Sequence, residues 1–408
     1  MRTRTWTRSC VLAAALTTWM SSGLAQTPII KQGFDAAWAR QPEQRAGAMR
    51  RDAAAATISA TQRWTPEPAA LEVSAKTDRY NSNEGVREYD ATLAVPLWLP
   101  GERSRAQAAA SSDSAAVDAR LLAAQWRLAA EVREAYWAFQ RARIDQELAT
   151  QRLANARQLA DDVARRVRAG DLARADSHQA EGAVAAAEAG LAEADIARLK
   201  AALAWRSLTG LPGEPGGLGT SEQRPAQAPT DDAHPATGEL MAQAEAARRH
   251  RDLAGLQTRA NPELTVGAVR ERDSIGERYS QSIVVGMRIP LGTTSASRTK
   301  VANASAEALE AESKLALETE RVRLQADTAR AALKSLDDAS KTSERRAALA
   351  RETRGFFQKS FRLGESDLPT RLRVEQEAFE AERQAARSRV EVDAAISQLR
   401  QALGLLPE

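Results

Sequence analysis

The chain has 408 residues, of which 43% are hydrophobic and only 4% aromatic, and its formal net charge is +3 at pH 7. Much of the apolar content is alanine, which favours long helices with small residues at their contacts over a thick globular core. The single cysteine excludes a disulfide framework, and the small net charge gives no case for nucleic-acid binding.

The N-terminus has the three parts of a secretory signal peptide. Three arginines lie among the first eight residues, an apolar stretch follows, and residues 23–25 supply small side chains for cleavage. We expect residues 1–25 to be removed on export, with a disordered or interfacial N-terminus as the alternative. No run of 18 apolar residues follows, so the mature chain is predicted to be soluble or to cross a membrane as β-strands.

The sequence repeats itself at one offset. Four pairs of prolines or glycines, residues that interrupt helices and strands, are each 194 positions apart: Pro68 and Pro262, Pro96 and Pro290, Gly170 and Gly364, Gly210 and Gly404. We therefore predict two copies of one structural unit, at 26–210 and 237–408, joined by a Gly- and Pro-rich linker at 211–236.

Each copy is predicted to contain the same elements in the same order. These are a lead-in helix (34–63 and 238–259), a strand pair (69–98 and 263–290), a long helix (104–168 and 297–362) and a returning helix (172–208 and 367–403). Apolar and small residues recur every three or four positions along the helices, which is typical of coiled coils. A helix of about 65 residues would be on the order of 100 Å long, which suits a tube or a stalk.

The predicted strands alternate between apolar and polar residues. Leu71, Val73 and Ala75 share one face of the first strand, and the other three strands show the same period. This pattern is typical of membrane β-strands, although a half-buried hairpin of a soluble protein would also produce it. Aromatic residues near the strand ends predict a membrane girdle formed by Trp64, Tyr80, Tyr89, Trp98 and Tyr279.

Four strands cannot close a membrane barrel, because small barrels need about eight, and an open sheet edge cannot face lipid. The chain is therefore expected to share a barrel with other copies under cyclic symmetry. Three copies would supply twelve strands and leave a lumen, which a helical tube could continue. The predicted fold class is membrane α+β: a trimeric 12-stranded β-barrel with four strands per chain, continued by a long α-helical coiled-coil barrel.

With these features the chain resembles the TolC family of outer-membrane channel proteins over essentially its whole mature length. The strand ends "VPLWLPGERSRA" and "IPLGTTSASRT" and the helix ends "RVRAGD" and "FRLGES" carry the resemblance. The stretches "EVREAYW" and "RVRAGDLARADSHQAE" are most similar to the CzcC-type branch, which serves heavy-metal efflux. Many members of that branch have a lipidated N-terminal cysteine, and this sequence does not.

The resemblance implies a homotrimer in the outer membrane of a Gram-negative bacterium, in contact with outer-membrane lipid and extended by helices into the periplasm. The linker and the C-terminal end would form an equatorial girdle around the helices. Its implied partners are a periplasmic adaptor, also called a membrane fusion protein, and an inner-membrane RND pump.

The two glycine interruptions are predicted to be helical hairpin tips. Glycine can take the positive φ that ends a helix, and Asp171 in one copy and Ser366 with Asp367 in the other can cap the returning helix. The resemblance implies that these tips contact the adaptor. The candidate contacts are Arg166, Gly170, Asp171, Asp176, Arg362, Gly364, Glu365, Ser366 and Asp367.

The resemblance also implies a periplasmic gate close to the tips. The positions that carry aspartate rings in the family are Thr370 and Arg373 here, so a purely acidic gate is not expected. Asp176 could supply a carboxylate from the first copy, and a ring of three carboxylates would attract cations. Asp176 also fits the role of a solvated acid in the first turn of a helix.

Catalytic and metal-binding motifs are missing from the sequence, and the three histidines, His178, His234 and His250, are scattered. We predict no enzyme, no cofactor and no metal site. The favoured function is a passive outer-membrane efflux duct, by resemblance for heavy-metal cations, with multidrug efflux or type I protein secretion as alternatives. An exported coiled-coil scaffold and a periplasmic enzyme are the competing interpretations.

Overall fold

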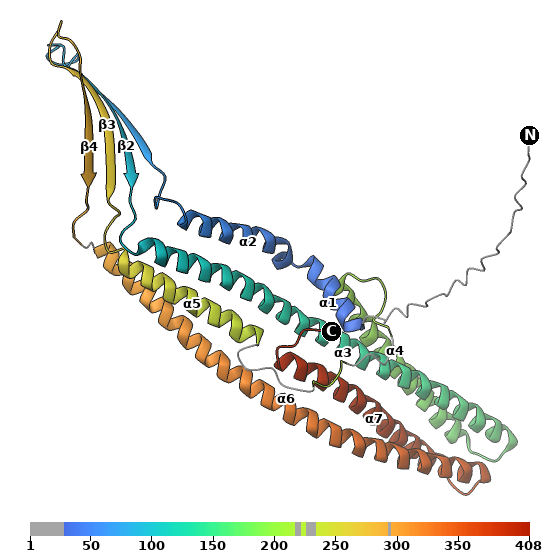
Figure 1. Ribbon diagram of the computed structural model, residues 1–408. Coiled ribbons are helices and arrows are strands. Elements are labelled where there is room, and N and C mark those ends of the chain that lie inside the picture. The colour runs from blue at the N-terminus through green and yellow to red at the C-terminus, as the bar shows by residue number, and fades with distance from the viewer. Residues whose placement is uncertain (1–27, 217–221, 226–233, 293–294) are drawn as a thin grey trace, which may run out of the picture.

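The computed structural model describes residues 28–216, 222–225, 234–292 and 295–408. It shows an elongated molecule with the four-stranded sheet at one end and the tips of the α3–α4 and α6–α7 hairpins at the other (Figure 1). The predicted signal peptide and parts of the predicted linker lie outside the described residues. The elements in chain order are α1 (Ile29–Arg40), α2 (Pro42–Thr61), β1 (Ala70–Thr77), β2 (Arg87–Pro96), α3 (Glu102–Ala169), α4 (Arg174–Thr209), α5 (Pro235–Leu256), β3 (Glu263–Arg272), β4 (Ser280–Arg288), α6 (Ser295–Leu363) and α7 (Leu368–Ala402).

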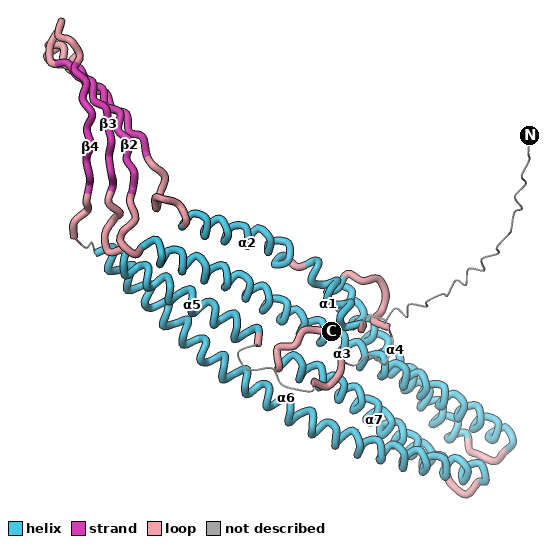
Figure 2. The backbone as a smooth tube through the Cα atoms, viewed as in Figure 1, coloured by secondary structure: helices cyan, strands magenta, loops and turns pink. Residues whose placement is uncertain are grey.

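Two long helices run the length of the helical body. They are α3 with 68 residues and α6 with 69, so each is about 100 Å long at 1.5 Å per residue. The returning helix α4 packs along α3, and α7 packs along α6, while α5 contacts both long helices near the strands (Figure 2). The sequence of helix, two strands, long helix and returning helix therefore occurs twice along the chain.

The lead-in segment at 34–63 was expected to be one helix and is two, which corrects that expectation. The break falls at Gln41, whose backbone is extended with φ −69° and ψ 138°. Its cause is Pro42, because the proline ring disfavours the helical conformation of the residue before it and supplies no amide N–H. Pro42 instead opens α2, where a missing N–H costs nothing.

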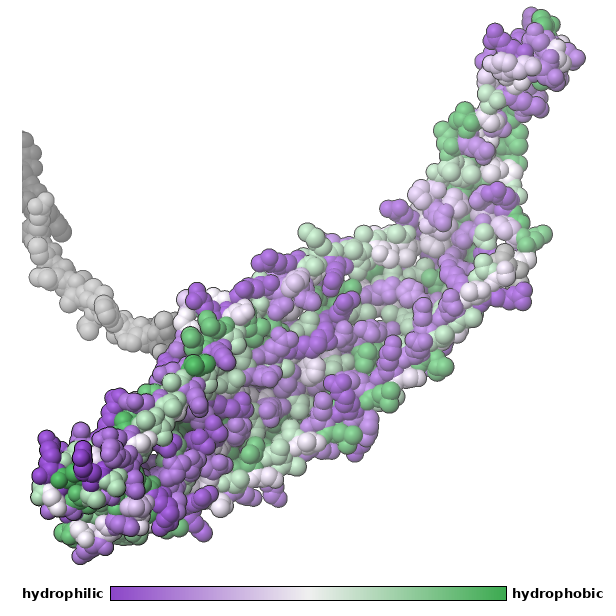
Figure 3. All heavy atoms as spheres, turned by 180° about the vertical axis from the view of Figure 1, so that it is seen from behind, coloured by the Kyte–Doolittle hydropathy of each residue, from purple (hydrophilic) through white to green (hydrophobic). Residues whose placement is uncertain are grey.

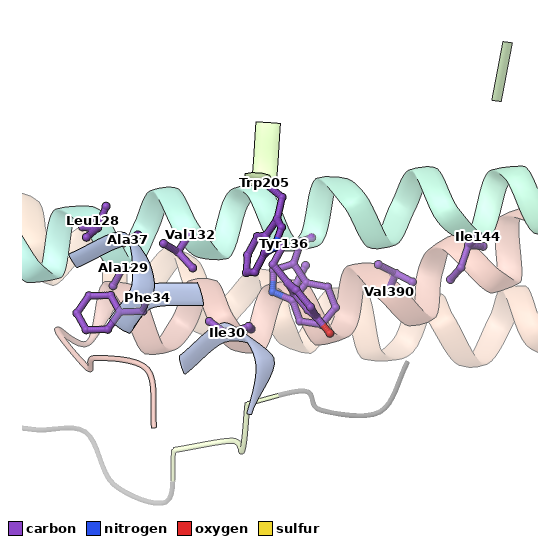
Figure 4. Packing of buried hydrophobic residues seen from close by; sticks show 12 residues of the cluster. Ile30, Phe34, Ala37, Leu128, Ala129, Val132, Tyr136, Ile144, Trp205 and Val390 are labelled. Atoms are coloured by element: carbon purple, nitrogen blue, oxygen red, sulfur yellow. The ribbon is translucent and has the colours of Figure 1, made fainter. Parts of the chain in front are cut away.

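The main apolar core lies in the middle of the helical body, where α1 meets α3, α4 and α7 (Figure 4). The Tyr136 ring makes edge contacts with Trp137 at 4.9 Å and with Trp205 at 6.1 Å between centroids. A Cβ atom at Gly33 would overlap the Trp205 ring, so a residue without a side chain lets α1 lie directly on α4. Through this contact α1 packs across the first hairpin, which α3 and α4 form.

The four strands form one antiparallel sheet in the order β1-β2-β3-β4. The central β2–β3 ladder runs from the pair Arg87 and Arg272 to the pair Pro96 and Glu263, and it joins the two halves of the chain. Strands β1 and β4 are the edges of the sheet.

Among the helices that the structure describes, none is both long enough and apolar enough to cross a membrane.

Candidate functional site: the hairpin tips and the sheet

Both hairpin tips end their long helix with the same backbone motif. After α3, the N–H of Gly170 donates to the Val167 carbonyl at 3.1 Å, and the N–H of Asp171 donates to the Arg166 carbonyl at 2.9 Å. The equivalent bonds surround Gly364 after α6. The two glycines have φ of 89° and 78°, so this is the Schellman motif, in which glycine is favoured because it has no Cβ.

The returning helices begin differently. Of the predicted caps Ser366 and Asp367, only Asp367 caps α7, since its Oδ1 accepts the N–H of Thr370 at 3.1 Å, whereas the Ser366 hydroxyl has no hydrogen-bond partner among the described residues. Hydrogen bonds from the Thr370 side chain and amide hold the pKa of the Asp367 carboxyl below its usual value. The predicted cap at Asp171 was wrong. Helix α4 has Ala173 as its N-cap, and the Asp176 carboxylate accepts the N–H of Ala173 at 3.0 Å. Asp171 lies two residues before this cap.

The two tips of one chain are held together. The Arg166 side chain of α3 donates from Nη1 to the Phe361 carbonyl oxygen of α6 at 2.8 Å. Its guanidinium also lies 4.9 Å from the centroid of the Phe361 ring. Phe361 and Leu368 are buried in one apolar cluster with Val163 of the first hairpin. Arg166 therefore links the two hairpins within the chain.

The predicted adaptor contacts differ in accessibility. Arg166, Asp176 and Ser366 are half-buried. The remaining six are exposed in and beside the two turns: Gly170, Asp171, Arg362, Gly364, Glu365 and Asp367.

Of the predicted gate residues, Asp176 and Thr370 lie in the first turns of α4 and α7, and Arg373 lies in the second turn of α7. Asp176 is used to cap α4, and Arg373 is exposed and paired with Glu377 one turn further along α7 at 2.6 Å. The neighbouring Arg371, which the sequence prediction missed, is only 5% exposed and lies 2.6 Å from Glu375. Burial lowers its pKa. The heptad spacing of α7 could have indicated that Arg371 is buried, because it lies seven residues before the seam residue Ala378.

One face of the sheet is apolar across all four strands, and we call it the apolar face. The pairing register aligns apolar residues in three neighbouring rows: Val95, Leu264 and Met287; Leu71, Leu93, Val266 and Val285; Val73, Ala91, Ala268 and Ile283. Along β3 the residues of this face are exposed, whereas those of the opposite face are half-buried or buried from 263 to 269. Figure 3 shows hydrophobic residues over the strands below a hydrophilic cap of loops.

The opposite face, which we call the polar face, carries charged and hydroxyl side chains. Glu72 and Thr92 are neighbours in one row, and Lys76 lies 3.6 Å from Glu88 in another. Gly267 leaves room for the Thr92 hydroxyl, which a Cβ at this position would overlap. The sheet thus separates an apolar from a polar surface.

The predicted girdle residues lie at the two ends of the strands. Trp64 and Trp98 lie at the helix end, and the Trp98 indole donates to the Arg63 carbonyl at 3.2 Å. The three tyrosines lie toward the loop end, where the rings of Tyr89 and Tyr279 are 6.4 Å apart. Trp64 and Tyr80 are more than 90% exposed. Contact of these residues with lipid stays a prediction.

A buried carboxylate joins the sheet to the helices. Glu102, at the start of α3, is 1% exposed, and its Oε2 accepts the Leu99 N–H at 2.9 Å and the Asn261 side chain at 2.8 Å. Its Oε1 accepts the Gln257 side chain at 2.7 Å. The carboxylate therefore ties the end of α5 and the segment before β3 to the start of α3.

A second buried carboxylate fixes part of the linker. Glu222 accepts two hydrogen bonds from Arg133 of α3, at 2.9 and 2.7 Å, and lies 3.4 Å from Arg400 of α7. All three side chains are about 95% buried. We call these residues the Glu222 cluster. Glu222 is an isolated glutamate in a Gly- and Pro-rich segment with no local pattern, so its burial and its pairing could not be predicted from the sequence.

Within the described parts of the chain, no group of three or more His, Cys, Asp or Glu side chains is placed to hold a metal ion. His178 is exposed in α4. His250 of α5 lies 2.9 Å from Asp113 of α3. His234 is buried at the start of α5, where its Nδ1 accepts the Ala236 N–H at 3.2 Å and its ring contacts Trp126.

His234 is expected to make stability depend on pH. Burial lowers its pKa, so as the pH falls the unfolded chain binds a proton before the folded chain does. Its contribution to stability is complete above about pH 6.5, the usual histidine value, and decreases below it. Thermal unfolding between pH 7.5 and 5.5 should show less loss on acidification in His234→Asn than in the wild type or in the control His178→Asn. Equal losses in all three proteins would contradict this assignment.

In its sheet with an exposed apolar face and its two helices of about 100 Å, the chain is similar in fold to a class of solved outer-membrane channel proteins. CusC has this fold, with a TM-score of 0.78 and 16% identity over 98% of this chain and 99% of that one. VceC from Vibrio cholerae gives 0.74 and 17%, over 93% and 97%. The open state of MtrE from Neisseria gonorrhoeae gives 0.74 and 18%, over 93% and 89%. At these identities the similarity concerns the fold.

Sequence comparison supports the same class for the first half of the chain. Residues 34–211 match the family model described as "Outer membrane efflux protein". The match agrees with the predicted family and with the predicted outer-membrane location, and the family is one of efflux proteins and not of enzymes. A comparison with curated protein sequences finds no match. The CzcC-type branch stays a prediction.

Proposed function

We propose that the chain is the outer-membrane exit duct of a tripartite efflux system. It works passively as a homotrimer, with a periplasmic adaptor and an inner-membrane RND pump as partners. The observation that supports this best is a sheet with an exposed apolar face whose edge strands, β1 and β4, have no further strand beside them in the described chain. Because lipid cannot hydrogen-bond an open edge, other copies would pair with these edges, and three copies would close a twelve-stranded barrel.

Exposed apolar residues on the helices support lateral contacts between copies. Ile196, Leu199 and Leu203 on α4 are more than half exposed and follow one another at spacings of three and four. On α6, Leu349, Phe356 and Leu363 are exposed at intervals of seven. Both spacings are those of a coiled-coil seam, which a neighbouring helix would cover.

The tips are proposed to meet the adaptor through their exposed turns, around Gly170 and Gly364. A gate formed by Asp176, Thr370 and Arg373 stays part of this proposal, although Asp176 has a capping role that suffices to explain it. Cation selectivity in planar-bilayer recordings that is unchanged in Asp176→Asn would exclude this residue from the gate.

We propose heavy-metal cations as the cargo because residues 131–137 and 166–181 resemble the metal-efflux branch. A duct that passes ions from a pump needs no binding site of its own, so this cargo is compatible with the described residues. Drugs and proteins are the alternatives that an export assay distinguishes.

The test is complementation of cells that lack this chain. The wild type should restore tolerance to divalent heavy-metal salts and cross-link to the adaptor, whereas Gly170→Pro and Gly364→Pro should assemble but do neither. Proline cannot adopt φ of 89° or 78° and lacks the N–H that closes each tip. Gly276→Pro is the matched control, since Gly276 has φ of 90° and open space around it but lies in the loop between β3 and β4.

Restored drug tolerance without metal tolerance would contradict the metal cargo. Wild-type cross-linking and tolerance in both tip variants would contradict the adaptor contacts. A chain that restores neither tolerance and forms no conducting trimer in planar bilayers would contradict the duct itself.

A further inference from the structure

The apolar face ends, on its loop side, in a row of arginines. The register pairs Tyr89 with Arg270 and, one row further out, Arg87 with Arg272. Side chains alternate between the two faces along each strand. The β2 residues of these pairs lie an even number of positions from Leu93, and the β3 residues lie an even number from Val266, so all four share the apolar face. Three guanidinium groups therefore lie just beyond the last apolar row.

Aromatic rings and backbone groups hold these arginines without neutralising them. Arg270 and Arg272 lie 4.6 and 5.1 Å from the centroid of the Tyr279 ring. Arg272 also donates to the Gly85 carbonyl at 3.1 Å, and Arg87 donates to the Thr77 hydroxyl at 3.3 Å. Cation–π contacts and bonds to neutral oxygens orient a guanidinium and leave its full charge.

The neighbouring carboxylates on the strands face the other way. Glu88 and Glu271 adjoin the arginines in sequence and therefore belong to the polar face, where Glu88 lies 3.6 Å from Lys76. The loop carboxylate of Asp78 accepts the Gly85 N–H and the Ser82 hydroxyl. In the parts of the chain that the structure describes, Arg87, Arg270 and Arg272 form no salt bridge.

The arginine row lies on the two central strands. Because β2 and β3 pair with each other within one chain, the row is complete in each protomer, however the edges β1 and β4 are closed. A buried contact between copies therefore does not explain these exposed or half-buried cations.

We propose that Arg87, Arg270 and Arg272 form a binding site for the phosphate groups of phosphorylated lipids at the outer surface of the membrane. The inference rests on the proposed function, which places the apolar face in the hydrocarbon layer. The arginines then lie at the level of the headgroups, beside the tyrosines Tyr89 and Tyr279 that suit that interface. A guanidinium matches phosphate oxygens with two parallel hydrogen bonds, and its charge attracts the anion.

The experiment measures lipid bound to the purified protein. Protein in nanodiscs of a phosphate-free glycolipid, digalactosyl diacylglycerol, is titrated with lipid A, a glycolipid with two phosphates, and bound lipid is counted by mass spectrometry. We expect the affinity of Arg270→Gln/Arg272→Gln to fall about tenfold or more, from the loss of two cations at the headgroup level. Lys76→Gln/Arg288→Gln is the matched control: it removes two cations from the polar face of the same sheet and should bind like the wild type.

Equal affinity of the arginine variant and the wild type would overturn the proposal. So would displacement of lipid A by inorganic phosphate at equal concentration, since that would indicate a site for free anions. The variant Arg270→Lys/Arg272→Lys keeps the charge and should recover part of the affinity. Failure of the wild type to enter nanodiscs at all would instead contradict the proposed function, and the two failures are therefore distinguishable.

Discussion

Replacing Val285 by lysine is expected to keep most of the protein out of the membrane, whereas lysine at the adjacent Val284 is expected to be tolerated. Val285 lies in the middle row of the apolar face, aligned with Leu93 and Val266. Val284 lies on the polar face, opposite Gly267. A lysine on the lipid side near the bilayer centre costs about 2–4 kcal/mol per chain, while one on the lumen side meets water.

The two variants form a close pair, because both change valine to lysine on one edge strand, at positions that are 68% and 50% exposed in the single chain. The measurement is the fraction of protein that stays with the membrane after alkaline extraction, together with the yield of trimer. If both lysines are tolerated equally, the apolar face does not contact lipid, and the proposed orientation of the sheet is wrong.

Replacing Glu222 by glutamine is expected to destabilise the helical body strongly. The change keeps the size of the side chain but leaves Arg133 buried without its carboxylate, and Arg400 keeps its hydrogen bond to the Gln223 carbonyl at 3.1 Å and its contact with Glu408 at 3.0 Å. Removing one partner of a buried ion pair typically costs about 3–5 kcal/mol, because the remaining charge is neither hydrated nor compensated. The free energy of unfolding, measured by denaturant titration in detergent, should fall by about this amount.

Glu214→Gln is the matched control. Glu214 also lies between the two halves of the chain and pairs with Arg198 at 2.5 Å, but both side chains are at least one-third exposed. Water screens such a pair, so its loss should cost about 0–1 kcal/mol. A similar loss of stability in the two variants would show that the Glu222 cluster does not hold the linker to α3 and α7.

The hairpins and strands could be predicted because their signals are local. A glycine that follows a coiled-coil pattern marks the end of a helix wherever the chain leads afterwards, and both tip glycines do end their helices. Alternation of apolar and polar residues likewise depends only on the strand itself. The local pattern does not give the register between strands. The pairing of β2 with β3, whose partners are 167 to 185 positions apart, aligns the apolar residues of the two hairpins into continuous rows across four strands.

The contacts that depend on distant segments could not be predicted. The packing of α1 onto Trp205 requires Gly33 and a helix that arrives about 170 residues later. The cap of α4 is a different case, because Ala173 lies three residues after Gly170 just as Asp367 lies three residues after Gly364, so the repeat offset applied to Asp367 would have given its position. The charges of the Glu222 cluster come from the linker and two helices, so no single stretch of sequence contains the pattern.

The unlike starts of α4 and α7 set a limit on any partner that meets the tips. In the first tip the returning helix has Ala173 as its N-cap, and the Asp176 carboxylate accepts the Ala173 N–H. In the second tip the N-cap is Asp367, and Pro369 lies in the first turn. In the proposed trimer, six tips would therefore alternate between two chemical surfaces. A partner with six identical subunits, one at each tip, could match only every second tip with the same contacts. Three of its subunits would then bind more weakly, or the six subunits would adopt two conformations.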